Sequence, residues 1–191
     1  RYEGSGRLTA EREVSVTAAD GAVTQLVAEH VILATGSVVA TLPGMELDGK
    51  TVVSSTEALE FDTVPENLVV IGAGVIGLEL GSVWSRLGAD VKVIEYLDQI
   101  TPGMDGEVCK QFQRILKRQG LEFKLGARVT AVKVNGKGDK AKATVEIEGG
   151  EPIQADKVLV AVGRKANSQG LGLEDVGVQV DQRGRVITND K

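Results

Sequence analysis

Three glycines near the middle of the chain have a spacing that suits dinucleotide binding. Gly72, Gly74 and Gly77 form a G-x-G-x-x-G pattern, which glycine-rich chains also produce by chance. Here the apolar run 68–71 precedes the pattern and predicts a buried strand, and a helical periodicity over 75–87 follows it. In this context the first glycine permits a tight turn, the second lets the backbone approach a pyrophosphate, and the third lets helix and strand pack closely. The pyrophosphate would bind at the N-terminus of that helix.

An acidic residue follows at the distance expected for ribose binding. Glu95 ends the predicted strand 91–95, 18 residues after Gly77. A carboxylate there accepts hydrogen bonds from the adenosine ribose hydroxyls and would repel a 2′-phosphate. Residues 96–101 contain no lysine or arginine that could bind such a phosphate. The pattern therefore predicts binding of NAD(H) rather than NADP(H), and the alternative is a glycine-rich turn without a ligand.

Other candidate residues leave two interpretations open. Glu79 lies in the apolar stretch 78–80 of the predicted dinucleotide helix, so it either faces the nicotinamide end of the cofactor or is a solvated helix position. Arg164 and the lysine after it either contact a nucleotide phosphate or are surface charges. Cys109 is expected to be buried and unreactive on a predicted helix, 105–119. His30 has no partner acid or nucleophile at a recognisable spacing.

The composition excludes several function classes. A single cysteine excludes an internal disulfide, a cysteine-based metal cage and a dithiol redox centre within the chain, and we expect no metal site. A net charge of −5 without a cluster of lysine and arginine argues against nucleic acid and anionic membranes as partners. The longest apolar-plus-glycine run, 69–78, is too short to span a bilayer. We expect a cytoplasmic protein, or a mitochondrial matrix protein in a eukaryote.

The elements that must position these residues alternate between short strands and helices. A capping-box spacing from Ser54 to Glu57 predicts a short helix near Ala58. The helix 105–119 is expected to bury a stripe that includes Val108, Phe112, Ile115 and Leu116. The remaining chain is expected to be rich in loops after residue 163. Alternating or continuously apolar runs predict strands over 12–18, 22–28, 30–34, 121–125, 128–134 and 157–162, and one arm of a hairpin over 143–150.

One stretch of sequence occurs twice. Residues 28–36 and 155–163 are identical at four of nine positions, and each copy follows an alternating strand and a glycine turn. The repeat predicts one supersecondary unit used twice. We therefore expect residues 1–36 to end an earlier nucleotide-binding domain whose own glycine-rich turn lies before Arg1. The alternative is a chance likeness of two unrelated hairpin-plus-strand segments.

The longer motifs resemble those of the dihydrolipoamide dehydrogenases, in the pyridine nucleotide–disulfide oxidoreductase family. These motifs are Thr51–Thr56, Val69–Trp84, Arg86–Asp90 and Val160–Arg164. The resemblance covers essentially the whole chain, and Gly72–Trp84 is closer to these enzymes than to glutathione or mercuric reductases. It implies an α/β fold with a Rossmann-like parallel sheet and a β-meander. It also implies FAD, a redox-active cysteine pair, and hydride passage from dihydrolipoamide through the disulfide and flavin to NAD⁺.

The resemblance also assigns roles to individual residues. It implies that the three glycines and Glu95 bind NAD, and that Glu79 lies at the nicotinamide end. It further implies the following contacts: Val129 with the adenine, Gly163 with the nicotinamide, and Thr35 and Gly36 with FAD. Ala166 stands where the family often has proline, which is a minor departure.

The same resemblance implies a division into domains. Residues 1–40 would be the C-terminal part of an FAD-binding domain segment, 41–163 an NAD-binding Rossmann-like domain, and 164–191 a return segment into the FAD-binding domain. The flavin glycine turn and the C-x-x-x-x-C pair would precede Arg1. The second flavin motif and the His–Glu base would follow Lys191. We therefore expect no catalytic residue in this chain, and no turnover by the chain alone.

Partners and rival functions follow from the resemblance as well. The whole protein would bind NAD(H), act on the lipoyl domain of 2-oxo acid dehydrogenase complexes, and form a homodimer. One alternative is the NAD-binding part of another flavin-dependent NADH oxidoreductase. The other alternative is a non-catalytic NAD-sensing module.

Overall fold

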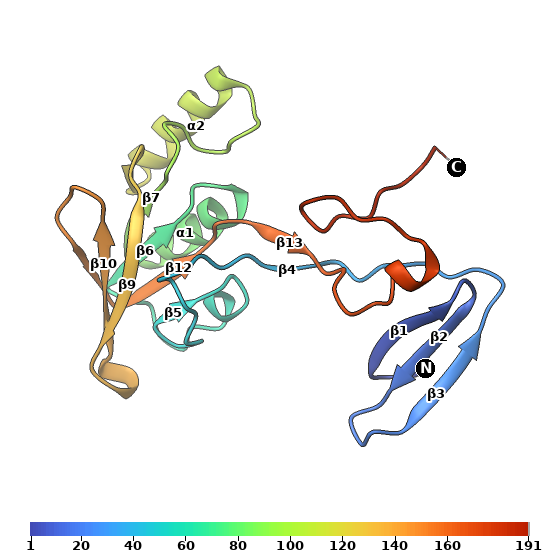
Figure 1. The fold of residues 1–191 in the computed structure, drawn as a ribbon. Helices are drawn as coiled ribbons and strands as arrows, with labels where there is room; N and C mark the ends of the chain where they lie inside the picture. Colours follow the sequence, from blue (N-terminus) through green and yellow to red (C-terminus); the bar gives the residue numbers. More distant parts are fainter. Residues whose placement is uncertain (191) are drawn as a thin grey trace. The chain divides into compact units, whose positions relative to one another are not determined.

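The chain divides into two compact units. The computed structural model describes residues 1–190, except that for Asp139 it describes the backbone alone. One unit consists of Arg1–Val38 together with the residues from Arg164 onward, and the other is Val39–Gly163. Figure 1 shows the strands and helices of both units. Each unit is described below by itself.

A five-stranded parallel sheet forms the centre of the unit Val39–Gly163. Each neighbouring pair in it is parallel, in the order β5-β12-β6-β7-β8. Helix α1 (Val75–Leu87) connects β6 to β7, and helix α2 (Gly106–Arg118) connects β7 to β8. This is the βαβαβ arrangement of dinucleotide-binding folds. The strands are β5 (Val52–Val53), β12 (Lys157–Val160), β6 (Asn67–Ile71), β7 (Asp90–Ile94) and β8 (Glu122–Lys124).

The central strand β6 is buried on both faces, which explains its nearly continuous apolar sequence. Along β6, Leu68 and Val70 belong to the core on the helix side, where Trp84 of α1 also packs. Val69 and Ile71 point the other way, into a second core. Successive side chains of a strand alternate between its two faces, so a strand with two covered faces needs apolar residues at every position.

A three-stranded antiparallel β-meander covers the second face. Its order is β11-β10-β9. Val145 of β10 and Val129 of β9 pack in one core with Val69 and Val158 of the parallel sheet. The expected α/β class, with a Rossmann-like parallel sheet and a β-meander, is confirmed. The meander strands are β9 (Val129–Asn135), β10 (Lys142–Ile147) and β11 (Ile153–Ala155).

The other unit contains two small sheets. In the first, β1 (Ser5–Ala10), β2 (Glu13–Thr17) and β3 (Val23–Val27) form an antiparallel meander. The predicted turn between β2 and β3 is confirmed, and its Asp20 carboxylate accepts the backbone N–H of Ala22 at 3.0 Å. In the second sheet, β4 (Ser37–Val39) pairs with β13 (Arg164–Ala166), and the unit boundary falls before the last residue of β4.

One predicted strand is wrong. Residues 30–34 form no strand, and Ile32 is 89% exposed. The equivalent segment of the second repeat copy, β12, lies between β5 and β6 and is buried. A continuously apolar strand is stable only with a neighbour on each edge and cover on each face. Within the described chain, residues 30–34 of the first copy have no neighbouring strand on either edge. The hairpins that precede the two copies are nevertheless both present.

The helix predictions are correct in position and partly wrong in orientation. Residues Cys109 and Leu116 are the buried positions of α2, whereas Phe112 and Ile115 of the expected stripe are partly exposed and Val108 is 57% exposed. Helical periodicity predicts which residues form the apolar face, but it does not determine which of them become buried against the sheet. The capping box at Ser54 starts only a single 3₁₀ turn, Glu57–Leu59, and the Glu57 carboxylate accepts the Ser54 backbone N–H at 2.8 Å.

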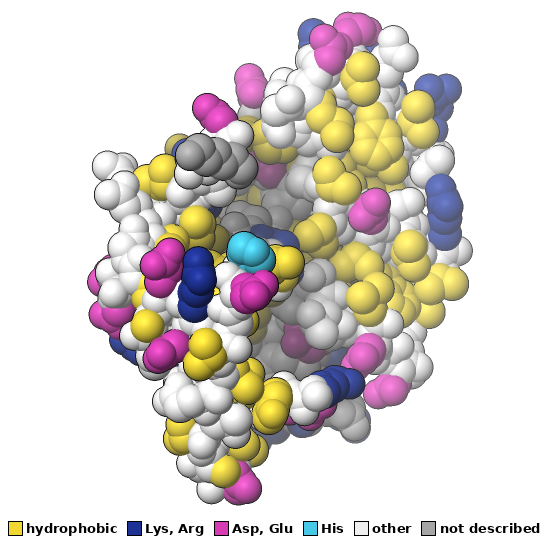
Figure 2. All heavy atoms as spheres, turned by 90° about the vertical axis from the view of Figure 1, so that its right-hand side faces the viewer, with side chains coloured by type: hydrophobic (Ala, Val, Ile, Leu, Met, Phe, Trp, Pro, Cys, Tyr) yellow, Lys and Arg dark blue, Asp and Glu magenta, His cyan; other side chains and the backbone are white. Residues whose placement is uncertain are grey.

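The surface carries charges of both signs. Acidic and basic side chains are interspersed on the face shown in Figure 2, with hydrophobic side chains between them.

Among the described residues no helix is long and apolar enough to cross a membrane.

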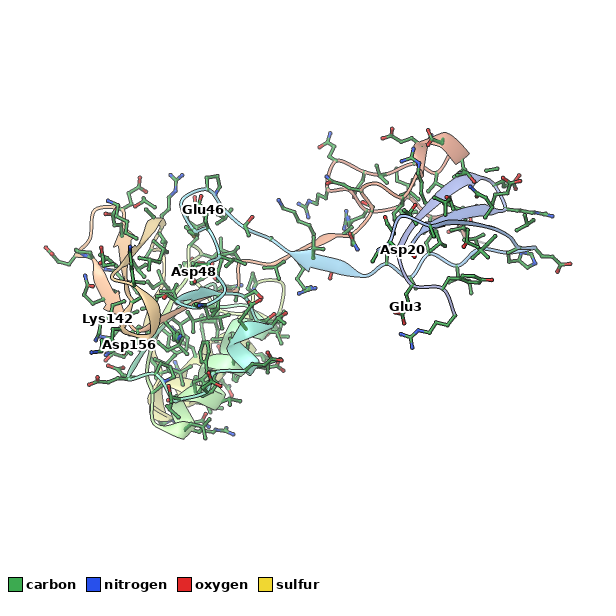
Figure 3. The ribbon with its side chains drawn as sticks, turned by 90° about the horizontal axis from the view of Figure 1, so that it is seen from below. Glu3, Asp20, Glu46, Asp48, Lys142 and Asp156 are labelled. Carbon is green, nitrogen blue, oxygen red and sulfur yellow. The ribbon has the colours of Figure 1, made fainter. Side chains whose placement is uncertain are left out.

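Asp156, which lies between β11 and β12, links β6 to β10 in the unit Val39–Gly163. Its carboxylate accepts the backbone N–H of Asn67 at 2.8 Å, where β6 starts, and pairs with Lys142 Nζ of β10 at 3.0 Å. Figure 3 shows Lys142 and Asp156 side by side. Burial alone would raise the pKa of Asp156, but the hydrogen bonds from Lys142 and Asn67 outweigh it and hold the pKa below the ordinary 3.8.

We expect Asp156→Asn to lower the free energy of unfolding at pH 7 by about 1 kcal/mol, the net worth of a typical hydrogen bond. A carboxyl whose pKa is depressed by folding stabilises fully above its ordinary pKa and loses this effect as the pH falls through the folded value. The gap between wild type and variant should therefore close below pH 3.8. Urea unfolding of both proteins at pH 7 and pH 3 measures this difference in the free energy of unfolding. An equal difference at the two pH values would contradict the lowered pKa of Asp156.

Candidate nucleotide-binding site

The glycine turn after β6 has no room for side chains at two of its three glycines. Gly72 has φ +103°, and a Cβ there would lie 2.4 Å from the carbonyl oxygen of Ala161. A Cβ on Gly77 would lie 2.3 Å from the carbonyl oxygen of Gly72. A Cβ on Gly74 would meet no atom within 4 Å. The fold itself therefore requires Gly72 and Gly77, whereas Gly74 leaves open space in front of the turn.

The N-terminus of α1 has no capping side chain. Gly74 is its N-cap and makes no side-chain hydrogen bond, and the first turn contains no acid. Helix α2 differs, because the Asp105 carboxylate accepts the backbone N–H groups of Glu107 and Val108. The first N–H groups of a helix have no partner within it and carry partial positive charge. At α1 these groups are left for an anion from outside the helix.

Glu95 is held against the same turn. Its Oε2 accepts the backbone N–H of Ala73 at 2.7 Å, and its Oε1 accepts that of Leu97 at 2.9 Å. Each carboxylate oxygen has a second lone pair that stays available. The two bonds fix the carboxylate beside the turn, so one residue both supports the turn and presents acceptors for ribose hydroxyls.

A cavity of about 760 Å³ lies in front of these elements, within the unit Val39–Gly163. It brings together five residues that the sequence predicted, which are Gly72, Gly74, Glu95, Val129 and Gly163. Apolar side chains dominate its lining, and the acid and one arginine are the charged members that the structure describes there. The rest of the lining comprises Leu42, Pro43, Met45, Ile71, Ile94, Tyr96, Leu97, Pro102, Ala127, Arg128, Thr130, Ala161 and Val162.

The sequence did not predict several of these lining residues. Leu42, Pro43 and Met45 come from the loop between β4 and β5, and no local sequence pattern places this loop over the glycine turn. The backbone N–H of Val132 donates to the carbonyl of Gly44 at 2.7 Å, which holds this segment against β9. Arg128 was missed because it belongs to a different element from the acid. The absence of lysine and arginine that argued against a 2′-phosphate concerns residues 96–101, directly after the acid, whereas Arg128 lies 33 residues after Glu95.

Four predicted residues lie outside this lining. Gly77 is buried in the first turn of α1. Glu79 is exposed and lines a smaller groove of about 280 Å³ together with residues of α2 such as Phe112. Thr35 and Gly36 belong to the other unit, where both are exposed and their carbonyls accept hydrogen bonds from Asn167. The roles assigned to these four residues stay predictions.

The remaining candidates have structural partners. Arg164 Nε donates to Ser37 Oγ at 2.7 Å across the β4–β13 pair. Cys109 is buried as expected, and its Sγ lies 3.1 Å from Thr101 Oγ1. No group of three or more potential metal ligands occurs in the part of the chain that the structure describes.

Comparison with known proteins gives the family. The model of the "Pyridine nucleotide-disulphide oxidoreductase" family matches residues 2–191. The chain belongs to this family. Within it, the chain is 49% identical over 195 residues to "Dihydrolipoamide dehydrogenase" of Chaetomium thermophilum, covering 99% of this chain and 38% of that protein. It is 51% identical over 183 residues to "Dihydrolipoyl dehydrogenase 3" of Pseudomonas aeruginosa, covering 95% of this chain and 39% of that protein.

Solved structures of the family share the fold. The crystal structure of LpdA from Mycobacterium tuberculosis superposes with a TM-score of 0.83 at 27% identity, over 95% of this chain and 40% of that one. The flavoprotein disulfide reductase RclA from Escherichia coli gives 0.85 at 23% identity, over 98% and 41%, which supports the fold alone. The chain thus spans about two-fifths of the length of the relatives that it matches. The predicted family and the predicted resemblance to dihydrolipoyl dehydrogenases are confirmed.

Proposed function

We propose that the unit Val39–Gly163 binds NAD(H). The observation that carries the proposal is the meeting of an uncapped helix N-terminus, an open glycine and a fixed carboxylate around one cavity. A pyrophosphate needs backbone N–H groups and positive potential, and a ribose diol needs paired acceptors. Both requirements are met within one βαβ unit.

The proposed pose follows from the order of these groups. The pyrophosphate lies on the N-terminus of α1 over Gly74. The adenosine ribose donates its hydroxyls to Glu95, and the adenine lies against Val129, which starts β9. The nicotinamide extends toward Gly163 at the end of the β12 segment. When bound, NAD⁺ supplies the hydride acceptor, and the residues of this chain only hold and orient it.

We further propose that the whole protein is a dihydrolipoyl dehydrogenase. In that reaction the two thiols of dihydrolipoamide form a disulfide, and NAD⁺ takes a hydride while a proton is released. The identities of 49% and 51% to such enzymes support this assignment. The lipoyl domain of 2-oxo acid dehydrogenase complexes and a second copy of the protein are then its proposed partners.

FAD belongs to the same proposal for the whole protein. Within this chain only Thr35 and Gly36 were assigned to it, and both are exposed in a segment without a strand. Two exposed residues do not make a flavin site, so we derive no step through FAD. The single cysteine cannot form a disulfide within the chain, and we propose that the 191 residues alone do not oxidise dihydrolipoamide.

Titration of the chain with NADH and NADPH tests the binding proposal. We expect NADH to bind and NADPH to bind at least about tenfold more weakly, because the Glu95 carboxylate repels a 2′-phosphate. Isothermal calorimetry measures both. Equal affinities or a preference for NADPH would refute the NAD assignment, and NADH formation from dihydrolipoamide by the chain alone would refute its proposed inactivity.

A further inference from the structure

The cavity carries one charge of each sign. Among its described lining residues, Glu95 is the anion and Arg128 is the cation. The positive potential at the uncapped N-terminus of α1 serves the pyrophosphate in the proposed pose. The pyrophosphate therefore does not require the positive charge of Arg128, although Arg128 lines the same cavity.

Backbone pairing places Arg128 at the same end of the cavity as the acid. The N–H of Ala127 donates to the carbonyl oxygen of Glu95 at 2.9 Å, and the N–H of Gly126 donates to that of Leu97 at 2.8 Å. Arg128 follows directly, before β9 begins at Val129. The two charges thus flank the place assigned to the adenosine ribose.

Arg128 is not committed to another anion. Its ion pair with Glu148 is long, with 3.9 Å between Nη1 and Oε1, and both side chains are 63% exposed. Exposed pairs of this kind contribute little, because the charges are well solvated and long side chains lose freedom on pairing. The guanidinium can therefore turn toward a ligand in the cavity at small cost. Its planar set of N–H donors suits a phosphate.

We propose that Arg128 is a second specificity-determining residue, which binds the 2′-phosphate of those NADP(H) molecules that enter the site. This inference rests on the proposed function. The preference of the site is then a balance in which Glu95 repels the 2′-phosphate and Arg128 attracts it. For NAD(H), which lacks this phosphate, Arg128 matters little.

The test measures the affinities of NADH and NADPH for the full chain and its variants by calorimetry. Arg128→Met removes the guanidinium, and Arg128→Lys keeps the charge. Lys133→Met is the matched control, because it removes one positive charge from the adjoining strand β9 at a residue outside the cavity lining. All variants are also made in the Glu95→Gln background, where the repelling charge is absent and NADPH binding is expected to be strong enough to measure.

We expect Arg128→Met to weaken NADPH binding in that background about tenfold, the worth of one hydrogen bond to a charged group. NADH binding should change less than about threefold, and Arg128→Lys should restore part of the loss. Lys133→Met should leave both affinities unchanged. The proposal is overturned by equal losses for the two dinucleotides, by no loss, or by undetectable NADPH binding in Glu95→Gln. Absence of NADH binding to the wild-type chain refutes the proposed function instead.

Discussion

Replacing Gly77 by alanine is expected to lower the free energy of unfolding by about 1–3 kcal/mol, the usual cost of overpacking a well-packed site. The new Cβ would lie 2.3 Å from the carbonyl oxygen of Gly72 and 3.0 Å from Val70 Cγ1. Alanine gains about 1 kcal/mol of helix propensity over glycine, but that gain is smaller than the clash with rigid backbone. Either α1 moves away from β6 or the glycine turn deforms.

Gly74→Ala is the matched variant, and it should behave in the opposite way. Its Cβ meets no atom within 4 Å, so the free energy of unfolding should change by less than about 0.5 kcal/mol, as at unconstrained surface sites. NADH affinity should fall about tenfold, since the methyl group occupies space that the pyrophosphate needs. Urea unfolding gives the free energy of unfolding of both variants, and calorimetry gives their NADH affinities. A stable Gly77→Ala, or a Gly74→Ala that binds NADH normally, would contradict this account.

Removing the charge of Glu95 is expected to damage both the turn and the site. In Glu95→Gln the amide has one oxygen, so either the N–H of Ala73 or that of Leu97 loses its acceptor. Ala73 is fully buried. An unsatisfied buried donor costs about 1–3 kcal/mol, and we expect the free energy of unfolding to fall by that amount.

The same substitution should lower NADH affinity about tenfold and raise NADPH affinity, because the ribose loses an acceptor and the 2′-phosphate loses a repelling charge. Calorimetry below the unfolding temperature of the variant separates binding from stability. Glu60→Gln removes one exposed carboxylate of the same unit that lies outside the cavity lining, and it should change neither quantity. If both substitutions have the same effect, the loss reflects net charge and the role of Glu95 is wrong.

Local patterns predicted the dinucleotide unit well because its signals are local. The strand before Gly72, helix α1 and the acid that follows β7 occur within 30 residues of one another. Each depends on near neighbours, through helical periodicity, continuous apolarity or a glycine spacing. Residues 75–87 were predicted as a helix with the bounds that the structure shows.

Predictions that depended on distant partners were less successful. The apolar run 30–34 has the composition of a buried strand but forms none, because strand formation requires neighbours that the described chain does not place beside it. The short strands β4 and β13 were not predicted for the converse reason. Each has only three residues, and they are strands because they pair with each other across more than 120 residues of sequence.

The sequence by itself determined the α/β class, the glycine turn, the acid at the strand end and the family resemblance. Only the tertiary structure decided which side of each glycine is crowded, that Glu95 binds the turn, and that Arg128 and the segment around Pro43 complete the cavity. The reason is physical. A turn or a helix depends on residues that lie within a few positions of one another. A cavity is formed by side chains that meet only after strands and crossovers have packed, and local sequence patterns do not determine the distances between them.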